Sequence, residues 1–222
     1  MLDSQALSSL RLSLQVASMA TLFIVLIGTL AAYFLAMKDF RGREVLDMFL
    51  TLPLVLPPTV TGYYLIILFG RNGLIGRPVF ESTGWSVMFT WQAAVIASFV
   101  VALPLMVKTA RAAIESVDRN LINASYTLGH SNFNTALKVI FPLAKKGIIA
   151  GAVLSFARAM GEFGATIMLA GNIPGKTDTM PIAIYSMAGS GEWSKAHAMV
   201  AVFTIISGVF LYIANRYGKK VL

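Results

Sequence analysis

Two charged side chains stand inside an otherwise apolar stretch of the sequence, and they have the clearest capacity for chemistry. Arg158 and Glu162 lie four positions apart, so on a helix they share one face and can form an ion pair. A charge at the centre of a bilayer costs at least about 2.5 to 3.5 kcal/mol, so this face should point into a helix bundle. The pair could bias the field along an anion path or lock one state of a gate, or it could be a self-neutralised structural pair.

Residues for catalysis or for metal binding are missing from the sequence. It contains no Cys, and its two histidines, His130 and His197, are far apart and outside any metal-ligand motif. No Ser, His and carboxylate set has the surroundings of a hydrolytic site. We therefore predict no catalytic residue, no metal ion and no cofactor, and the chain is not expected to be an enzyme.

Prolines interrupt a second apolar stretch. Pro53, Pro57 and Pro58 each remove a backbone donor and disfavour a continuous helix. Freed backbone groups are tolerated at membrane depth only where they face protein or water, so this segment either lines a path or is a structural kink. The residues expected to line the path or form its gate are Pro57, Pro58, Thr59, Thr61, Gly62, Arg158, Gly161, Glu162 and Gly164.

The elements that position these residues must be membrane helices. Of the 222 residues, 57% are hydrophobic and 13% are charged, and the mean hydropathy is +0.74, which exceeds the apolar share of ordinary soluble domains. Stretches of about 20 apolar residues are long enough to cross a bilayer as helices, and they lack the alternation of a membrane barrel. We predict an all-α integral membrane protein with one domain, 1–222, and five spans at about 14–37, 46–69, 85–107, 148–170 and 196–212.

The basic residues predict the orientation of these spans. The net charge of +8 comes from cations scattered between apolar runs, which is unlike the basic face of a nucleic-acid-binding protein. With five spans, most cations fall on one side, so the N-terminus is predicted outside and the C-terminus in the cytoplasm, with the chain in the cell membrane and in contact with lipid. These cations are Lys38, Arg41, Arg43, Lys108, Arg111, Arg119, Lys138, Lys145, Lys146, Arg216, Lys219 and Lys220.

Two local patterns predict helix contacts. In the long loop 109–146, Leu121, Ala124, Leu128 and Phe133 recur every three to five residues, which predicts a short amphipathic helix that lies on lipid or docks to a cytoplasmic partner. In the fourth span, small residues recur every four positions and allow close helix packing, either within the chain or between two copies. These small residues are Gly147, Gly151, Ser155 and Ala159.

The loop also carries a spaced motif. The motif consists of Asn123-Ala124-Ser125, then Gly129 six positions after Asn123, and then Val139 to Pro142. It resembles the EAA loop of ABC importer permeases. In this sequence Asn123 stands where that loop usually has glutamate. This resemblance implies a coupling helix that docks into a cytoplasmic ABC ATPase. The coupling residues it implies are Asn123, Ala124, Ser125, Gly129, His130, Ser131, Phe133 and Pro142.

Two further blocks, 52–64 and 157–177, resemble the molybdate branch of this family, and sulfate permeases are similar but looser. The resemblance implies a MetI-like homodimer with the path at its interface, cytoplasmic ABC ATPases that hydrolyse ATP, and an extracytoplasmic oxyanion-binding protein. The outer loop expected to face that receptor contains Asn172, Pro174, Gly175 and Lys176. The substrate alternatives are molybdate or tungstate and sulfate or thiosulfate. The alternative from another class is an ion-coupled carrier, for which coupling-ion ligands and an internal repeat are not evident.

Overall fold

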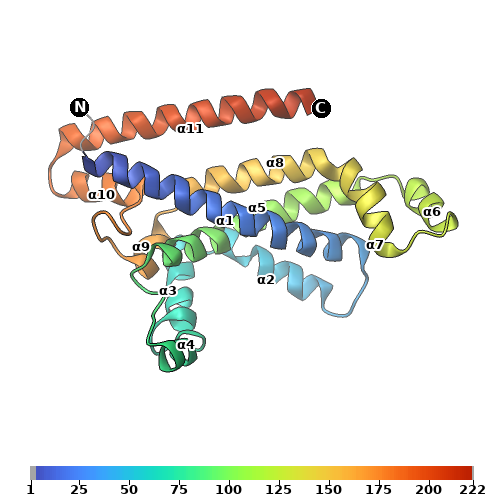
Figure 1. The fold of residues 1–222 in the computed structure, drawn as a ribbon, viewed down its shortest axis with the longest axis horizontal. Helices are drawn as coiled ribbons and strands as arrows, with labels where there is room; N and C mark the ends of the chain where they lie inside the picture. The colour runs from blue at the N-terminus through green and yellow to red at the C-terminus, as the bar shows by residue number, and fades with distance from the viewer. Residues whose placement is uncertain (1–3, 222) are drawn as a thin grey trace.

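The computed structural model describes residues 4–221, and within that range every regular element is a helix (Figure 1). The predicted all-α class is confirmed. Four long helices run along the long axis of the molecule: α1 (Ser4–Met37), α5 (Trp91–Glu115), α8 (Phe141–Met160) and α11 (Trp193–Val221). The shorter elements are α2 (Arg43–Val55), α3 (Pro58–Phe69), α4 (Gly76–Thr83), α6 (Arg119–Thr127), α7 (Asn132–Thr135), the π-helical turn η1 (Ala136–Ile140), α9 (Gly164–Ala170) and α10 (Met180–Gly189).

The core forms where α1, α5 and α8 pack together, with α5 in the centre. The predicted small-residue ridge of α8 faces α5. Gly147 lies directly against Ala113, Gly151 leaves no room for a methyl group beside Met106, and the Ser155 hydroxyl donates to the Ala102 carbonyl at 3.3 Å. Of the two readings of this ridge, packing within the chain is therefore the one observed.

The predicted count of five spans is not confirmed. Among residues 4–221, the helices long and apolar enough to cross a membrane are the four at Gln5–Met37, Trp91–Glu115, Asn132–Met160 and Trp193–Tyr212. The expected span 46–69 is divided into α2 and α3, because Leu56 and Pro57 adopt extended backbone before Pro58 begins the next helix. The break occurs at the prolines, as the sequence predicted, because proline disfavours a continuous helix.

The other expected spans differ at their ends. The third begins at Trp91, where the Thr90 side chain caps α5, and it continues to Glu115 into the expected loop. The fourth, 148–170, is wrong as one helix, because α8 ends at Met160 and α9 begins at Gly164. The fifth begins at Trp193 and is preceded by α10, which the sequence analysis missed.

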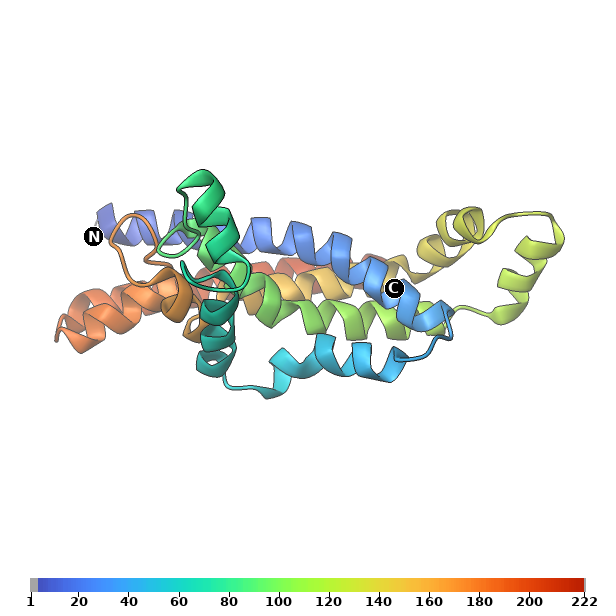
Figure 2. The ribbon, with the colours of Figure 1, turned by 90° about the horizontal axis from the view of Figure 1, so that it is seen from below.

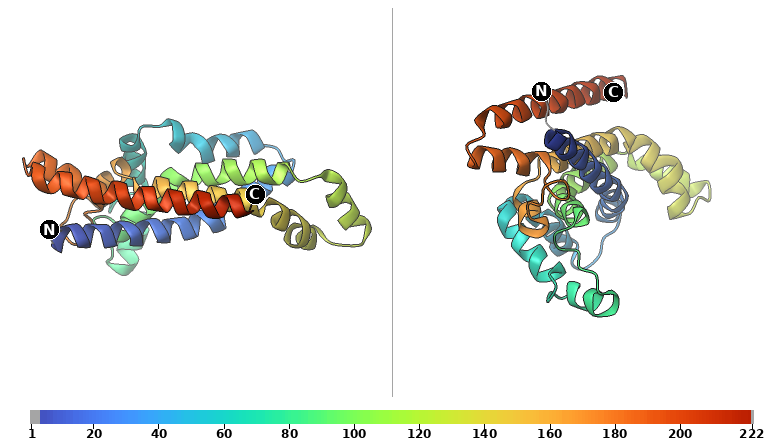
Figure 3. Two further views of the ribbon diagram at one scale, coloured as in Figure 1. Left: turned by 90° about the horizontal axis from the view of Figure 1, so that it is seen from above. Right: turned by 60° about the vertical axis from the view of Figure 1, so that its left-hand side comes forward.

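The two ends of the bundle carry different elements. The helices α6 and α7 project from the end at which α1 and α5 finish, and α11 runs toward that end (Figures 1 and 3). The N-terminal helix begins at the opposite end, near α10 and the 171–179 loop, while α3 and α4 stand out from the bundle (Figure 2). This arrangement gathers the cations of the 38–43 and 108–146 segments at the α6 end; Arg216, Lys219 and Lys220 lie outside the described side chains.

Candidate functional site

The projecting segment α6–α7 is held by local hydrogen bonds. Asp118 caps α6 by accepting from the Asn120 amide at 2.8 Å. At its other end, the Gly129 amide donates to Tyr126 and the His130 amide donates to Ser125, which is the Schellman pattern. Gly129 has φ +82°, in the left-handed region that favours glycine. The motif glycine therefore ends the helix and turns the chain.

Several large apolar side chains of this segment are exposed. Leu128 and Phe133 are 78% and 70% exposed, and Leu121 and Tyr126 accompany them. Beneath them, the buried Ser125 hydroxyl bonds the Thr135 hydroxyl at 2.9 Å and ties α6 to α7. The predicted motif residues divide accordingly: Ser125 is buried, His130 is partly buried, and Asn123, Ala124, Ser131 and Phe133 are exposed.

Pro142 lies in the first turn of α8, directly after the π-helical turn η1. A proline ring clashes with the carbonyl four residues earlier and removes a backbone donor. The wider π turn over 136–140 accommodates this restriction. The end of the motif thus fixes how the projecting segment joins α8.

The structure brings the proline break that the sequence predicted against the break between α8 and α9, which the sequence did not predict. A methyl group on Gly164 would lie 2.7 Å from the Pro58 Cβ, and one on Gly62 would lie 2.7 Å from the Met168 Cβ. The starts of α3 and α9 are therefore in close contact. Thr61, Gly62 and Gly164 are buried in this contact, while Pro57, Pro58, Thr59 and Gly161 stay exposed beside it.

Arg158 and Glu162 form the expected ion pair. The Arg158 Nη1 and Glu162 Oε2 are 2.8 Å apart, and the Glu162 side chain is 1% exposed while that of Arg158 is 33% exposed. The second carboxylate oxygen of Glu162 accepts from the Ala165 amide at 2.8 Å. Glu162 thus neutralises the arginine and also satisfies a backbone donor at the start of α9, a role that spacing alone did not indicate.

The expected outer loop has an exposed rim and a buried base. Asn172, Pro174, Gly175 and Lys176 are exposed. Beneath them the buried Asp178 accepts from the Gly175 amide at 2.8 Å and from the Ser9 hydroxyl at 3.1 Å. Asp178 was missed by the sequence analysis, and the only available signal was an acidic residue three positions after a turn glycine.

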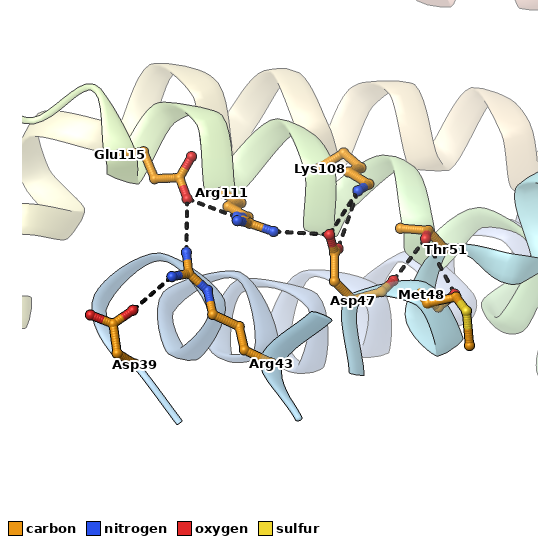
Figure 4. Close-up of polar contacts among 8 residues, drawn as sticks. All are labelled: Asp39, Arg43, Asp47, Met48, Thr51, Lys108, Arg111 and Glu115. Atoms are coloured by element: carbon orange, nitrogen blue, oxygen red, sulfur yellow. Dashed lines mark hydrogen bonds and ion pairs between the residues drawn. The ribbon is translucent and has the colours of Figure 1, made fainter. Parts of the chain in front are cut away.

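A network of charges at the α6 end was also missed (Figure 4). It links α2 to the last two turns of α5 through three carboxylates and three cations. The sequence analysis counted its cations only for topology, although opposite charges at spacings of four were visible. The network consists of Asp39, Arg43, Asp47, Lys108, Arg111 and Glu115.

Residues 24–220 match the family described as the inner membrane component of binding-protein-dependent transport systems. The molybdenum transport system permease protein ModB of Escherichia coli K12 is 42% identical over 210 residues, which cover 95% of this chain and 92% of that protein. The ModB protein of Haemophilus influenzae is 39% identical over 214 residues, covering 96% and 93%. The sulfate transport system permease protein CysT of Salmonella typhimurium is 32% identical over 224 residues, covering 99% and 80%.

Solved structures share the fold. A bacterial ABC transporter that imports alginate has a chain with TM-score 0.81 at 15% identity, covering 99% of this chain and 80% of that chain. The inward-facing MetNI methionine ABC transporter has one with TM-score 0.74 at 17% identity, covering 96% and 94%. The expected importer-permease architecture is therefore confirmed at the level of the fold.

Proposed function

Since the chain belongs to the family of inner membrane components of binding-protein-dependent transport systems, we propose that it is the permease subunit of an ATP-driven molybdate importer. The observation that carries this proposal is the identity of about 40% to molybdenum permeases over more than nine tenths of both chains. Tungstate has the same shape and charge as molybdate and is included in the proposed substrate class. The sulfate permease CysT is less similar, so sulfate is not favoured.

The proposed contact with a cytoplasmic ABC ATPase is the exposed face of α6–α7. A projecting helical segment with exposed apolar side chains is suited to insertion into a groove of a partner. Leu128 and Phe133 supply such side chains. The turn at Gly129 lies between them and sets the direction in which the chain leaves α6. Asn123 is exposed on α6 without a charge, so shape carries this contact in place of an ion pair.

The proposed path runs past the α3–α9 contact, at an interface with a second copy of the chain. Support comes from the exposed residues Pro57, Pro58 and Thr59 and from the apolar outer faces of α2 and α3, which leave room for another subunit. In the described part of the chain, Thr61, Ser98 and Thr166 are buried hydroxyls without a hydrogen-bond partner, on three helices that pack together. Because an unpaired buried hydroxyl costs about 1 to 3 kcal/mol, a packing that pairs these hydroxyls would gain that free energy, and we propose such a packing for the other state of alternating access.

The ion pair of Arg158 and Glu162 has a proposed role beside this path. Arg158 is partly exposed, so its guanidinium can attract an oxyanion, while Glu162 cancels most of its charge. A fully unpaired arginine would hold the anion too tightly, since conduction needs weak binding. The pair therefore favours passage over capture.

We further propose that the N-terminus is extracytoplasmic and that the 171–176 loop faces an oxyanion-binding protein. The loop lies at the end of the bundle opposite α6, and its exposed Lys176 stands on a hydrogen-bonded base. ATP hydrolysis is assigned to the partner ATPases. Location in the cell membrane is supported by the helices long enough to span a bilayer and by the family of inner membrane components.

The decisive experiment is transport in proteoliposomes that contain the permease, its ATPase and its receptor. We expect uptake of labelled molybdate that requires ATP and receptor and that excess tungstate suppresses more strongly than sulfate. Uptake by the permease alone, driven by an ion gradient, would identify a secondary carrier. A receptor that prefers sulfate by orders of magnitude would overturn the substrate.

A further inference from the structure

The helix α2 lies along α5 and buries little of its own surface in the apolar core. None of its residues is buried, and Leu50 contacts the core only from a partly buried position. Its large apolar side chains, such as Phe49 and Val55, are exposed. Lipid tails solvate such side chains about as well as a neighbouring helix does, so apolar contact gives α2 little preference for α5 over lipid. Polar contacts therefore add to packing in setting its position.

The charge network supplies those contacts (Figure 4). Asp47 of α2 lies 3.1 Å from the Lys108 Nζ and 3.0 Å from the Arg111 Nη1, so one carboxylate bridges two cations of α5. Glu115 of α5 accepts from Arg111 at 2.8 Å and lies 3.5 Å from Arg43 at the start of α2. The two helices are therefore joined at two levels.

This network is stronger than a single surface ion pair. The side chains of Asp47 and Arg111 are only 23% and 22% exposed, which reduces screening by water and salt. Each of the bridging carboxylates holds two cations, so the ordering of one side chain serves two pairs. By contrast, Asp39 at the edge is 97% exposed and adds little.

The joined helices lead to the two functional segments. At its end, α5 passes through 116–118 into α6, the proposed ATPase contact. At its own end, α2 leads to the break at Leu56 and Pro57, beside the proposed path. The charge network and the packing of α2 along α5 connect the two helices laterally.

We propose that Asp47 is a positioning residue that makes α2 move with α5 as one body, so that a displacement of α6 reaches the break at Pro57. This inference rests on the proposed function of α6 as the ATPase contact. The network acts as a strut, which stays closed through the transport cycle. A structural role alone would affect stability and leave the ratio of transport to ATP hydrolysis unchanged.

The absence of Cys from the chain permits a direct test. The double variant Asp47→Cys with Lys108→Cys is reconstituted with Cys-free ATPase and receptor subunits, and ATP hydrolysis and molybdate uptake are measured. We expect uptake per ATP to fall about fivefold or more, the factor that corresponds to about 1 kcal/mol. Bridging the two thiols with a short bifunctional reagent should restore most of it, because the covalent link replaces the strut.

Arg77→Cys with Glu81→Cys is the matched control, since this ion pair lies within α4 and joins no other helix. It should transport normally with and without the bridge. Normal coupling in the unbridged Asp47 variant, or continued loss after bridging, overturns the strut. If the double variant does not accumulate in the membrane, Asp47→Asn is measured in its place, because it keeps the size of the side chain. Normal uptake per ATP in Asp47→Asn would also overturn the strut. Lack of ATP-dependent uptake by the unsubstituted complex overturns the proposed function itself.

Discussion

Replacement of Gly129 by alanine tests the coupling segment with the fewest side effects. Gly129 has φ +82°, and a methyl group added there would meet no atom within 4 Å. The substitution therefore creates no clash, and its whole cost is the left-handed backbone of a residue with a Cβ, about 1 to 2 kcal/mol. That cost opposes the turn between α6 and α7 and should lower its population relative to other conformations about 5- to 30-fold.

The assay is molybdate uptake per ATP hydrolysed in proteoliposomes with the ATPase and receptor. We expect the Gly129→Ala variant to retain ATP hydrolysis and lose most of the uptake, and Gly129→Asn to be milder, because asparagine tolerates the left-handed region better. Gly84→Ala is the matched control: Gly84 ends α4 with φ +68° and has equally open space. It carries a similar backbone cost at the opposite end of the molecule. If Gly129→Ala couples like the unsubstituted permease, the assignment of this turn to ATPase coupling is refuted.

Four other outcomes are expected. Glu162→Gln leaves Arg158 without its partner and should lower the thermal unfolding temperature. The double change Arg158→Gln with Glu162→Gln should lower it less, and the reverse order would argue against a compensated ion pair. Gly164→Ala forces a methyl group against Pro58 and should cost about 1 to 3 kcal/mol of stability, whereas Gly208→Ala, with open space, should cost none; equal melting curves would contradict the close contact. Asp178→Ala frees the Gly175 amide and should speed hydrogen exchange over 173–177, and unchanged exchange would show that the loop needs no such base. Single cysteines at Asn172 and Ser131 should react with impermeant thiol reagents from opposite sides of the membrane, and labelling from one side would overturn the topology.

Features that depend on local composition could be predicted from the sequence. The break at Pro57 follows from the chemistry of proline. A short helix in the 109–146 loop follows from the spacing that begins at Leu121, although α6 ends at Thr127 and Phe133 lies in the separate helix α7. The ion pair of Arg158 and Glu162 follows from a separation of four residues in an apolar stretch.

Features that depend on tertiary contacts could not be predicted. The stretch that contains Gly161 has no proline, and glycine is common in membrane helices, so the end of α8 is visible only once Glu162 is seen to bond the Ala165 amide. The helix α10 has ten residues, too few for a span, and therefore gave no signal at the window used for membrane helices. Asp47 and Lys108 are 61 residues apart, and only the packing of α2 on α5 brings them together.

The two helix breaks lie against each other, and neither short helix is long enough to span the membrane alone. With 12 residues, α3 is about 18 Å long, well short of the roughly 30 Å hydrocarbon core, and α9 is shorter still. Each leaves backbone groups at its broken end, and these must be satisfied by protein or water. Gly164 approaches Pro58 so closely that an added methyl group would lie 2.7 Å from the Pro58 Cβ. If α2 displaces Pro58 during transport as proposed, we expect Gly164 and the adjacent Glu162, which pairs with Arg158, to move with it, so that a single motion reaches both sides of the proposed path.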